Sequence, residues 1–457
     1  MTRDDVAADL DAIDSHIHTH IQEWMAELAR LCAVPSVSAR HEGIEECAGL
    51  VAKMLAEHGF SAEVSPIEGG HPVVLATATG VNTGRNLLFY NHYDVQPPEP
   101  LELWESPPFE LTERNGSVYA RGAKDDKGEF ICRLAALAAI KAARGSYPCN
   151  ITWLAEGEEE IGSVHLPEWV RKHEDRLKVD AAVWEEGGIE MNGAPIVRLG
   201  ARGLLYVELS VATLSRDAHS GNANLLPNAA WRLIWALATL KGPDERVLIP
   251  GFYDTVRPPS ESQEKLLTAE PGGAANVREE FGLSSLLGGI TDVNRAYFSP
   301  TCNIAGIGAG YQGEGSKTVI PSRSIAKLDF RLVPDQDPDE VLEQLRAHLE
   351  KGGFSDVKIQ VLGAERPGIT DPDAAIVRLT AEIGAELYGK PAQVTPLTGG
   401  TTPMYLFTER GVPVVAPGVG WGAMNRAHSP NEFMRLQDFE LAARHIARLA
   451  IRFAASD

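Results

Sequence analysis

Basic residues are scarce in this chain: 42 lysines and arginines face 63 aspartates and glutamates among 457 residues. The formal charge of −21 at pH 7 repels both phosphate backbones and anionic lipid surfaces. We therefore expect the protein to bind neither nucleic acid nor a membrane surface.

Long apolar runs are missing as well. No stretch approaches the roughly 18 uninterrupted apolar residues that a membrane-spanning helix needs. The first ten residues, MTRDDVAADL, lack the apolar core of a secretory signal, so we expect a cytoplasmic protein. Cysteine is also rare, and the five present form no CxxC pair, which argues against a disulfide framework and against a zinc ribbon.

The sequence does have the composition of a globular protein, with 44% hydrophobic and 23% charged residues, and it is long enough for two or three domains. One part of the chain carries short, continuous apolar runs, which favour strands buried on both faces. Helical periodicity over residues 11–32 and again after Gly128 supplies helices to cover them. We therefore predict an α/β domain with a helix-covered, mixed or parallel sheet. The apolar runs are residues 87–90, 151–154, 181–184 and 412–416.

The pattern changes near residue 204, where apolar and polar residues begin to alternate as in a strand with one buried face. The alternation returns over 326–332 and 357–361, and a helix is predicted between them over Pro338–Lys351. A long Gly- and Pro-rich stretch occupies residues 243 to 321. We predict an inserted α+β domain, an antiparallel sheet with helices on one face. The predicted domains are residues 1–203 with 368–457, and residues 204–367.

Histidine and acidic side chains follow the buried runs of the α/β domain, and two aspartates lie between the first two runs, in a turn ahead of a helix. In an open α/β sheet, ligands collect beyond the carboxyl ends of the strands, so these side chains should meet at one edge. Carboxylates crowded together cannot all stay ionised without a cation, which predicts a metal site. Taken singly, each has a plainer explanation, such as a solvated helix start, a core histidine or an ordinary turn. The residues are His92, Asp94, Asp125, Asp126, Glu156, Glu158, Glu159, Glu160, Glu185, Glu186 and His428.

Together with further motifs, this pattern resembles the co-catalytic zinc family that contains carnosinase, cytosolic non-specific dipeptidase, aminoacylase and succinyl-diaminopimelate desuccinylase. The resemblance covers nearly the whole chain and lies nearest to the dipeptidase branch. Each motif is weak alone, but the ordered set is specific. The motifs are NHYDVQP (91–97), ARGAKDDKG (120–128), AEGEEEIGS (155–163), WEEGG (184–188), ARG (201–203), RDAHSG (216–221), KTVIP (317–321), FRLVP (330–334), GGTTP (399–403) and AHSPNE (427–432).

The resemblance implies two divalent metal ions, with zinc as the first choice and manganese or cobalt as alternatives. Asp94 would orient the ring of His92. The family also has a cis peptide bond after the bridging aspartate, which we expect here between Asp125 and Asp126. The implied ligands are His92, Asp125 and Glu186 for one ion, and Asp125, Glu160 and His428 for the other.

The same resemblance implies hydrolysis of an amide bond by a hydroxide that bridges the two ions. Glu159, next to a ligand but not one itself, would act as general base and pass the proton to the leaving amine. His219, in the inserted lid domain, matches a residue that in dimeric relatives reaches into the partner subunit's site to stabilise the oxyanion. This implies a homodimer formed through the lid. The implied substrate contacts are Thr318 and Arg331 in the lid, and Gly399, Gly400 and Thr401 in the catalytic domain.

The implied substrates are dipeptides or short peptides. Arg331 suits their carboxylate, because a guanidinium donates paired bonds, although its polar strand face also fits a solvated role. One departure matters: Leu397 and Thr398 precede the Gly399-Gly400 turn, where cytosolic dipeptidases carry an Arg-Glu pair. The acid that would help to recognise a free amino terminus is missing there. An N-acyl-amino-acid deacylase, acting on a blocked amine, therefore stays open as the alternative, and a non-catalytic binding protein with the same fold is a third interpretation.

Two other motifs do not point to a site. The run His16, His18 and His20 fits surface positions better than a metal site. Residues 308–313, GAGYQG, match a dinucleotide-binding fingerprint by letter, but an extended segment follows where that site needs a helix.

Overall fold

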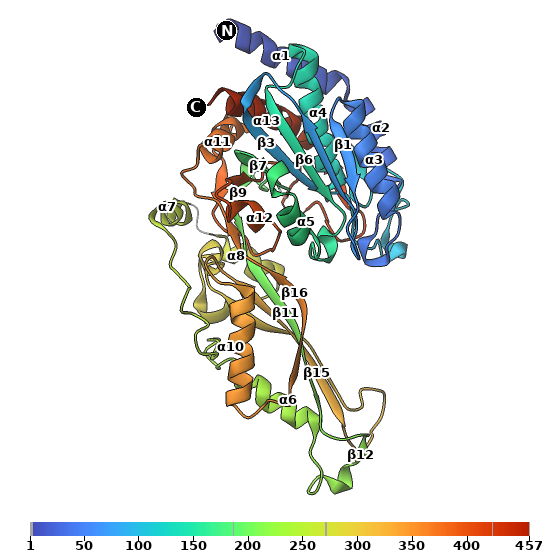
Figure 1. Ribbon diagram of the computed structural model, residues 1–457, viewed down its shortest axis with the longest axis vertical. Helices are drawn as coiled ribbons and strands as arrows, with labels where there is room; N and C mark the ends of the chain where they lie inside the picture. The colour runs from blue at the N-terminus through green and yellow to red at the C-terminus, as the bar shows by residue number, and fades with distance from the viewer. Residues whose placement is uncertain (1–2, 186, 270–271, 423, 457) are drawn as a thin grey trace. The chain divides into compact units, whose positions relative to one another are not determined.

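The computed structural model describes residues 3–185, 187–269, 272–422 and 424–456. The chain folds into two compact units, an α/β unit and an α+β unit (Figure 1). The predicted boundaries lay after residues 203 and 367, and the units divide after residues 199 and 368. The α/β unit comprises residues 1–199, 369–396 and 406–457, and the α+β unit comprises residues 200–368 and 397–405.

The α/β unit is built on a six-stranded sheet in the order β1-β2-β6-β3-β7-β19. Strand β2 runs antiparallel to both of its neighbours, and the other strands are parallel. Leu87 on β3 pairs with Ile151 on β6 and with Ala181 on β7, so the predicted apolar runs end at one edge of the sheet. The strands are β1 (Ser61–Ser65), β2 (Val73–Ala78), β3 (Asn82–His92), β6 (Cys149–Glu156), β7 (Ala181–Val183) and β19 (Val414–Val415).

Helices cover this sheet through their apolar faces: α4 packs on β3, α13 on β3 and β6, and α3 on β1 and β2. Phe130, Leu134 and Leu137 of α4 are all buried, as their helical spacing predicted. Gly145 ends α4 with a φ of 78°, a left-handed conformation that favours glycine. The helices are α1 (Arg3–Thr19), α2 (Ile21–Cys32), α3 (Ile44–Glu57), α4 (Lys127–Arg144), α5 (Leu166–Lys172), α11 (Ala375–Tyr388), α12 (Tyr405–Thr408) and α13 (Leu436–Ala455).

The single helix predicted over residues 11–32 is interrupted at His20, between α1 and α2. The Thr19 hydroxyl donates to the Ser15 carbonyl at 2.8 Å, and His20 Nδ1 donates to the His16 carbonyl at 2.8 Å. These side chains compete with backbone N–H groups for the carbonyls of the last turn, which favours an end to α1 there.

Short strands complete the α/β unit. Strand β20 pairs with β5, and Phe433 lies opposite Tyr119. This pairing brings the segment that follows His428 beside the segment that leads to Asp125. The short strands are β4 (Thr112–Arg114), β5 (Ser117–Tyr119), β8 (Gly188–Ile189), β9 (Pro195–Arg198), β18 (Gln393–Thr395) and β20 (Phe433–Arg435).

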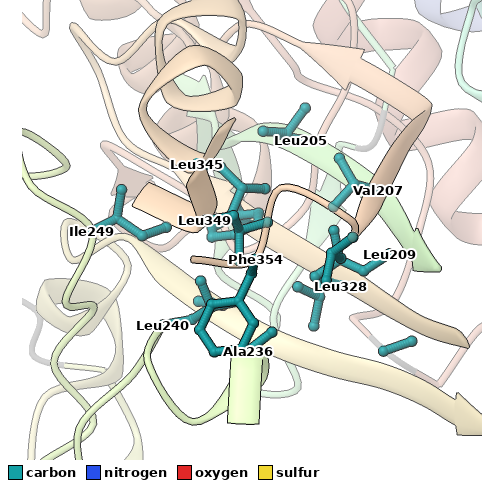
Figure 2. Close-up of a cluster of buried hydrophobic side chains, with 14 of the residues drawn as sticks. Leu205, Val207, Leu209, Ala236, Leu240, Ile249, Leu328, Leu345, Leu349 and Phe354 are labelled. Atoms are coloured by element: carbon teal, nitrogen blue, oxygen red, sulfur yellow. The ribbon is translucent and has the colours of Figure 1, made fainter. Parts of the chain in front are cut away.

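The α+β unit is built on an antiparallel four-stranded sheet in the order β13-β15-β11-β16. The predicted alternation is confirmed in β11 and β15, which bury every second residue, but not in β16, where Val361 is 40% exposed. Their buried side chains, such as Leu209 and Leu328, pack with Leu345 of α10 and Ala236 of α6 in one core (Figure 2). The elements are β11 (Gly203–Ala212), β12 (Ala218–His219), α6 (Ala229–Leu237), β14 (Val319–Ile320), β15 (Arg323–Leu332), α10 (Pro338–Lys351) and β16 (Lys358–Glu365).

The Gly- and Pro-rich stretch contains regular elements that the sequence did not reveal. Strand β13 lies at the edge of the four-stranded sheet, and its small residues and glycines leave most of its side chains partly or fully exposed. Because an edge strand buries little, its apolar pattern is weak. None of the helices within the described ranges is both long and apolar enough to cross a membrane. The remaining elements are β10 (Gly200–Ala201), α7 (Glu261–Ala269), α8 (Ala274–Glu280), α9 (Val293–Ala296), β13 (Thr301–Ala309) and β17 (Gly368–Ile369).

A buried histidine makes the α/β unit sensitive to acid. His445 Nε2 donates to the Thr380 carbonyl at 2.9 Å, and burial lowers the pKa of His445 from 6.5 to about 4. The unfolded chain therefore gains this proton at a higher pH than the folded chain does. The free energy of unfolding should fall as pH drops from about 6.5 to about 4, by about 3 kcal/mol in total. We predict that His445→Gln reduces this dependence of the unfolding free energy on pH, measured by urea unfolding of metal-free protein between pH 6.5 and 4. A pH dependence equal to that of the wild type would contradict the assignment.

Candidate active site

Two predicted histidines meet at one carboxylate, that of Asp125, at the edge where the parallel strands end. His92 is the last residue of β3, and Asp125 lies in the turn that leads into α4. His92 Nε2 lies 3.0 Å from Asp125 Oδ1. His428 Nε2 lies 3.1 Å from Asp125 Oδ2. Asp125 thus stands between two imidazoles, with one on each oxygen.

Glu160 joins the same cluster through His428. The distance from His428 Nε2 to Glu160 Oε2 is 3.1 Å. Gln96 holds this carboxylate, because its backbone N–H donates to Oε1 at 3.1 Å and its Nε2 donates to Oε2 at 3.0 Å. Gln96 belongs to a motif that the sequence singled out, but it received no role there.

The tautomer of His92 leaves one nitrogen facing the carboxylates. Nδ1 lies 3.0 Å from the main-chain carbonyl of Asp94, which can only accept, so Nδ1 carries a proton. In the neutral ring, Nε2 then presents its lone pair toward Asp125, and Glu185 Oε2 lies 3.5 Å away. A lone pair that faces carboxylates needs a proton or a metal cation between them.

The proton affinities of the cluster reflect this crowding. Burial alone would lower the pKa of His92, but the bonds to Asp125 and Asp94 raise it well above its usual value. Burial alone would raise the pKa of Asp125, yet the bonds from His428 and His92 hold it well below its usual value. Burial raises the pKa of Glu160. Protons thus compensate charges here that divalent cations would compensate equally well.

The donor set fits two ions of the zinc type, which accept imidazole nitrogen and carboxylate oxygen. Candidate ligand atoms of His92, Asp125 and Glu160 lie within 4.8 Å of one another, and so do those of His92, Asp126 and Glu185. Because Asp125 offers one oxygen to each side, a bridging role suits it.

Glu186, the ligand predicted for the first ion, lies outside the described residues. Its neighbour Glu185 is buried and has its Oε2 3.5 Å from His92 Nε2. The resemblance favoured Glu186 over Glu185 as the ligand, and Glu186 stays a prediction. The signal that favours Glu185 is its place as the first acidic residue beyond β7.

Asp126 anchors the end of β3. Its Oδ2 accepts from Asn91 Nδ2 at 2.6 Å and from the His92 N–H at 3.1 Å. The bond between Asp125 and Asp126 is cis, as the resemblance led us to expect.

The predicted base, Glu159, begins a short 3₁₀ turn after β6 together with Glu160. Burial, followed by the nearby charge of Glu185, raises the pKa of Glu159 well above its usual value. A carboxylate with a raised pKa can accept and return a proton near neutral pH.

Asp94 holds that turn. It is fully buried, and its carboxylate accepts the N–H of Glu159 at 3.3 Å and the N–H of Glu160 at 3.1 Å. The sequence predicted that Asp94 orients the ring of His92. Its main-chain carbonyl makes the shorter contact with that ring, and its Oδ1 lies 3.4 Å from Nδ1.

The predicted substrate contacts of the α+β unit form two separate pairs. Arg331 Nη1 donates to Thr401 Oγ1 at 2.6 Å. Thr318 Oγ1 lies 3.2 Å from His219 Nε2, beside the pairing of β12 and β14. Arg331 is next to last in β15, whereas β14 precedes the start of that strand, so the two pairs lie at opposite ends of it.

Gly399, Gly400 and Thr401 belong to the α+β unit, although the sequence placed them in the catalytic domain. The Arg202 N–H donates to the Gly400 carbonyl at 2.9 Å. A Cβ on Gly399 would lie 2.9 Å from the ring of Tyr297, so this close approach favours glycine. These contacts with Arg202 and Tyr297 explain why the segment belongs to the α+β unit.

Comparison with known proteins identifies the family of the chain. The model of "Peptidase family M20/M25/M40" matches residues 88–452, most of the chain. The chain belongs to this family. It is a metal-dependent peptide hydrolase, and the α/β sheet with its inserted α+β unit is the fold of that family.

Similar proteins include peptidases of several kinds. This chain is 30% identical to the Beta-Ala-His dipeptidase of Homo sapiens over 74% of its own length and 67% of the human protein. It is 28% identical to the Cys-Gly metallodipeptidase of Schizosaccharomyces pombe over 75% of this chain and 76% of the yeast one. Among solved structures, the M20 family metallo-carboxypeptidase of Sulfolobus solfataricus superimposes with a TM-score of 0.90 at 38% identity, covering 95% of this chain and 100% of its own.

The contacts of Asp94 predict a defect in metal binding. In Asp94→Asn, one of the two acceptors for the Glu159 and Glu160 N–H groups becomes a donor, so the turn should lose its position. We expect metal affinity to fall by about 10–100-fold, measured by competition with a chelator. The control is Asp180→Asn. Asp180 also accepts a backbone N–H, from Asn86 at 2.7 Å, but Asn86 lies on β3 well before the cluster at the end of that strand. Equal affinities in both variants would contradict the role of Asp94.

Proposed function

We propose that this peptidase hydrolyses dipeptides and short peptides with the help of two divalent ions bridged by Asp125. The observation that carries the proposal is the pair of imidazoles on that carboxylate, at 3.0 Å from Oδ1 and 3.1 Å from Oδ2. A single carboxylate between two nitrogen donors is what a bridged two-metal site requires. Zinc suits these donors, and manganese and cobalt are the alternatives.

We assign the ligands around the two oxygens of Asp125. His92 and Glu185 would share one ion with Asp125. His92 Nε2 lies 3.0 Å from Asp125 Oδ1 and 3.5 Å from Glu185 Oε2. Glu160 and His428 would share the other. The bound ions would lower the pKa of a water molecule and polarise the carbonyl of the scissile bond.

The chain's own residues would move the proton and orient the substrate. Glu159, with its raised pKa, would take a proton from the attacking water and return it to the leaving amine. Arg331 would receive the substrate carboxylate, because its guanidinium already donates to the Thr401 hydroxyl and remains partly exposed.

The names of the relatives favour dipeptides as substrates, since the human and the yeast relative are both dipeptidases. The relative from Sulfolobus solfataricus is a carboxypeptidase, which is consistent with short peptides as well. Five cysteines are buried as free thiols, which supports a reducing compartment such as the cytoplasm.

The length of β15 supports a homodimer. Arg323 pairs with Ala212 at one end of this strand and Arg331 with Leu204 at the other, eight residues or about 26 Å away. An extended dipeptide spans only about 7 Å. One substrate therefore cannot reach both Arg331 and His219 of the same chain, so His219 would serve the site of a second copy, where it would stabilise the oxyanion.

Helix α6 offers a surface for that second copy. Trp231 and Trp235 are each 55% exposed, and their rings stack 5.9 Å apart. Ile234, at 43% exposure, adds to this apolar face. Aromatic residues of this kind are enriched in subunit interfaces.

A substrate panel tests the proposed reaction. The metal-loaded enzyme should hydrolyse dipeptides with free amino termini and leave N-acetyl and N-succinyl amino acids intact. Removal of metal with a chelator should abolish turnover, and zinc, manganese or cobalt should restore it. Turnover confined to the blocked amines would instead establish the deacylase, and turnover that survives complete removal of metal would contradict both.

Complementation tests the shared site. Glu159→Gln should lower kcat by about 10²–10⁴-fold at unchanged metal content, because the general base is lost. His219→Ala should also be poorly active. When the two variants are co-expressed, half of the dimers should be mixed, each with one intact site, giving about a quarter of wild-type activity. No recovery in the mixture would contradict a site built from two copies.

A further inference from the structure

One fully buried carboxylate accepts four hydrogen bonds beside the proposed metal centre. Glu432 Oε1 accepts the N–H groups of Lys124 and Asp125, each at 2.9 Å. Its Oε2 accepts the Gly122 N–H at 3.1 Å and Arg121 Nη1 at 2.7 Å. Both oxygens therefore hold the turn that presents Asp125.

Glu432 and Arg121, which form an ion pair, also contact two further segments. Glu432 follows His428 by four residues, so it anchors the loop that carries this histidine. Arg121 Nη2 donates to the Pro97 carbonyl at 3.2 Å, next to Gln96, which holds Glu160. The Glu432–Arg121 pair thus joins the loops that present Asp125 and His428 to the segment of Gln96, which holds Glu160.

The loop of His428 needs such an anchor. Arg426, His428 and Asn431 adopt φ values of 57°, 62° and 61°. Residues other than glycine pay about 1 kcal/mol or more each in this region, so the surroundings must hold the loop in place. Asn431 contributes a second anchor, since its Oδ1 accepts the Glu105 N–H at 2.9 Å.

We propose that Glu432 is a positioning residue, which acts with Arg121 to set the geometry of the second metal site, formed by Asp125, Glu160 and His428. The inference rests on the proposed two-metal function. An ordinary buried ion pair has a different role: its loss would weaken the fold without lowering the affinity of one metal site more than that of the other. The second site should lose more than the first, because all three of its ligands depend on these loops. The first site shares only Asp125 with them and takes His92 from the end of β3 and Glu185 from the residues after β7.

Metal titration of Glu432→Gln tests the proposal. The glutamine keeps the shape of the side chain but replaces one acceptor oxygen by a donor. Zinc is titrated into metal-free protein against a chelator, and cobalt is titrated while its visible spectrum reports the ligand geometry. We expect the second equivalent to bind about 10–100-fold more weakly than in the wild type and the first to lose less affinity, with an altered cobalt spectrum.

The control is Asp438→Asn, which weakens another ion pair in the same part of the chain. Buried Asp438 there lies 2.6 Å from the partly exposed Arg435. This variant should lose stability to urea but keep both metal affinities. If Glu432→Gln does not fold, Arg121→Lys replaces it. Lysine has one nitrogen where Arg121 uses Nη1 for Glu432 and Nη2 for the Pro97 carbonyl, and the same selective loss is expected.

Two outcomes separate this inference from the proposed function. The role of Glu432 alone would be overturned if the folded Glu432→Gln variant bound both equivalents with wild-type affinity. The same conclusion would follow if Asp438→Asn weakened metal binding as much as Glu432→Gln does. A wild-type protein that binds fewer than two ions would overturn the proposed function itself.

Discussion

The repulsion between carboxylates at one edge of a sheet is the constraint on which the site depends. Parallel strands deliver Glu159, Glu160 and Glu185 to the same edge as Asp125, and burial keeps water from screening them. Two imidazoles on Asp125 offset part of this charge. The α/β sheet supplies the convergence, and the convergence in turn calls for cations, which is why fold and metal chemistry belong together in this family.

The four-stranded sheet of the α+β unit imposes a second constraint, one of length. Its core side chains fix the register of β11 and β15, so the ends of β15 stay about eight strand residues apart. Arg331 and His219 therefore lie toward opposite ends of β15. In the proposed dimer, a small substrate would draw them from different copies of the chain.

Much of the fold could be predicted from apolar patterns, because buried strands and amphipathic helices leave periodic signals. Helix α10 has the predicted bounds, and β3, β6 and β7 follow the predicted runs. Strand β13 was missed, since glycine and alanine at a sheet edge bury too little to leave a pattern. The ligand cluster around Asp125 could be found because its members follow strand ends. Glu432 and Gln96 could not be given roles, since a sequence does not say which backbone N–H groups a buried side chain will meet.

The central claim is that Asp125 bridges two cations, and a crystal structure of the zinc-loaded protein with anomalous scattering measures this directly. The account predicts two zinc peaks, one on each side of the Asp125 carboxylate, with His92 and Glu185 at one and Glu160 and His428 at the other. A single peak, or peaks that do not touch Asp125, would contradict it.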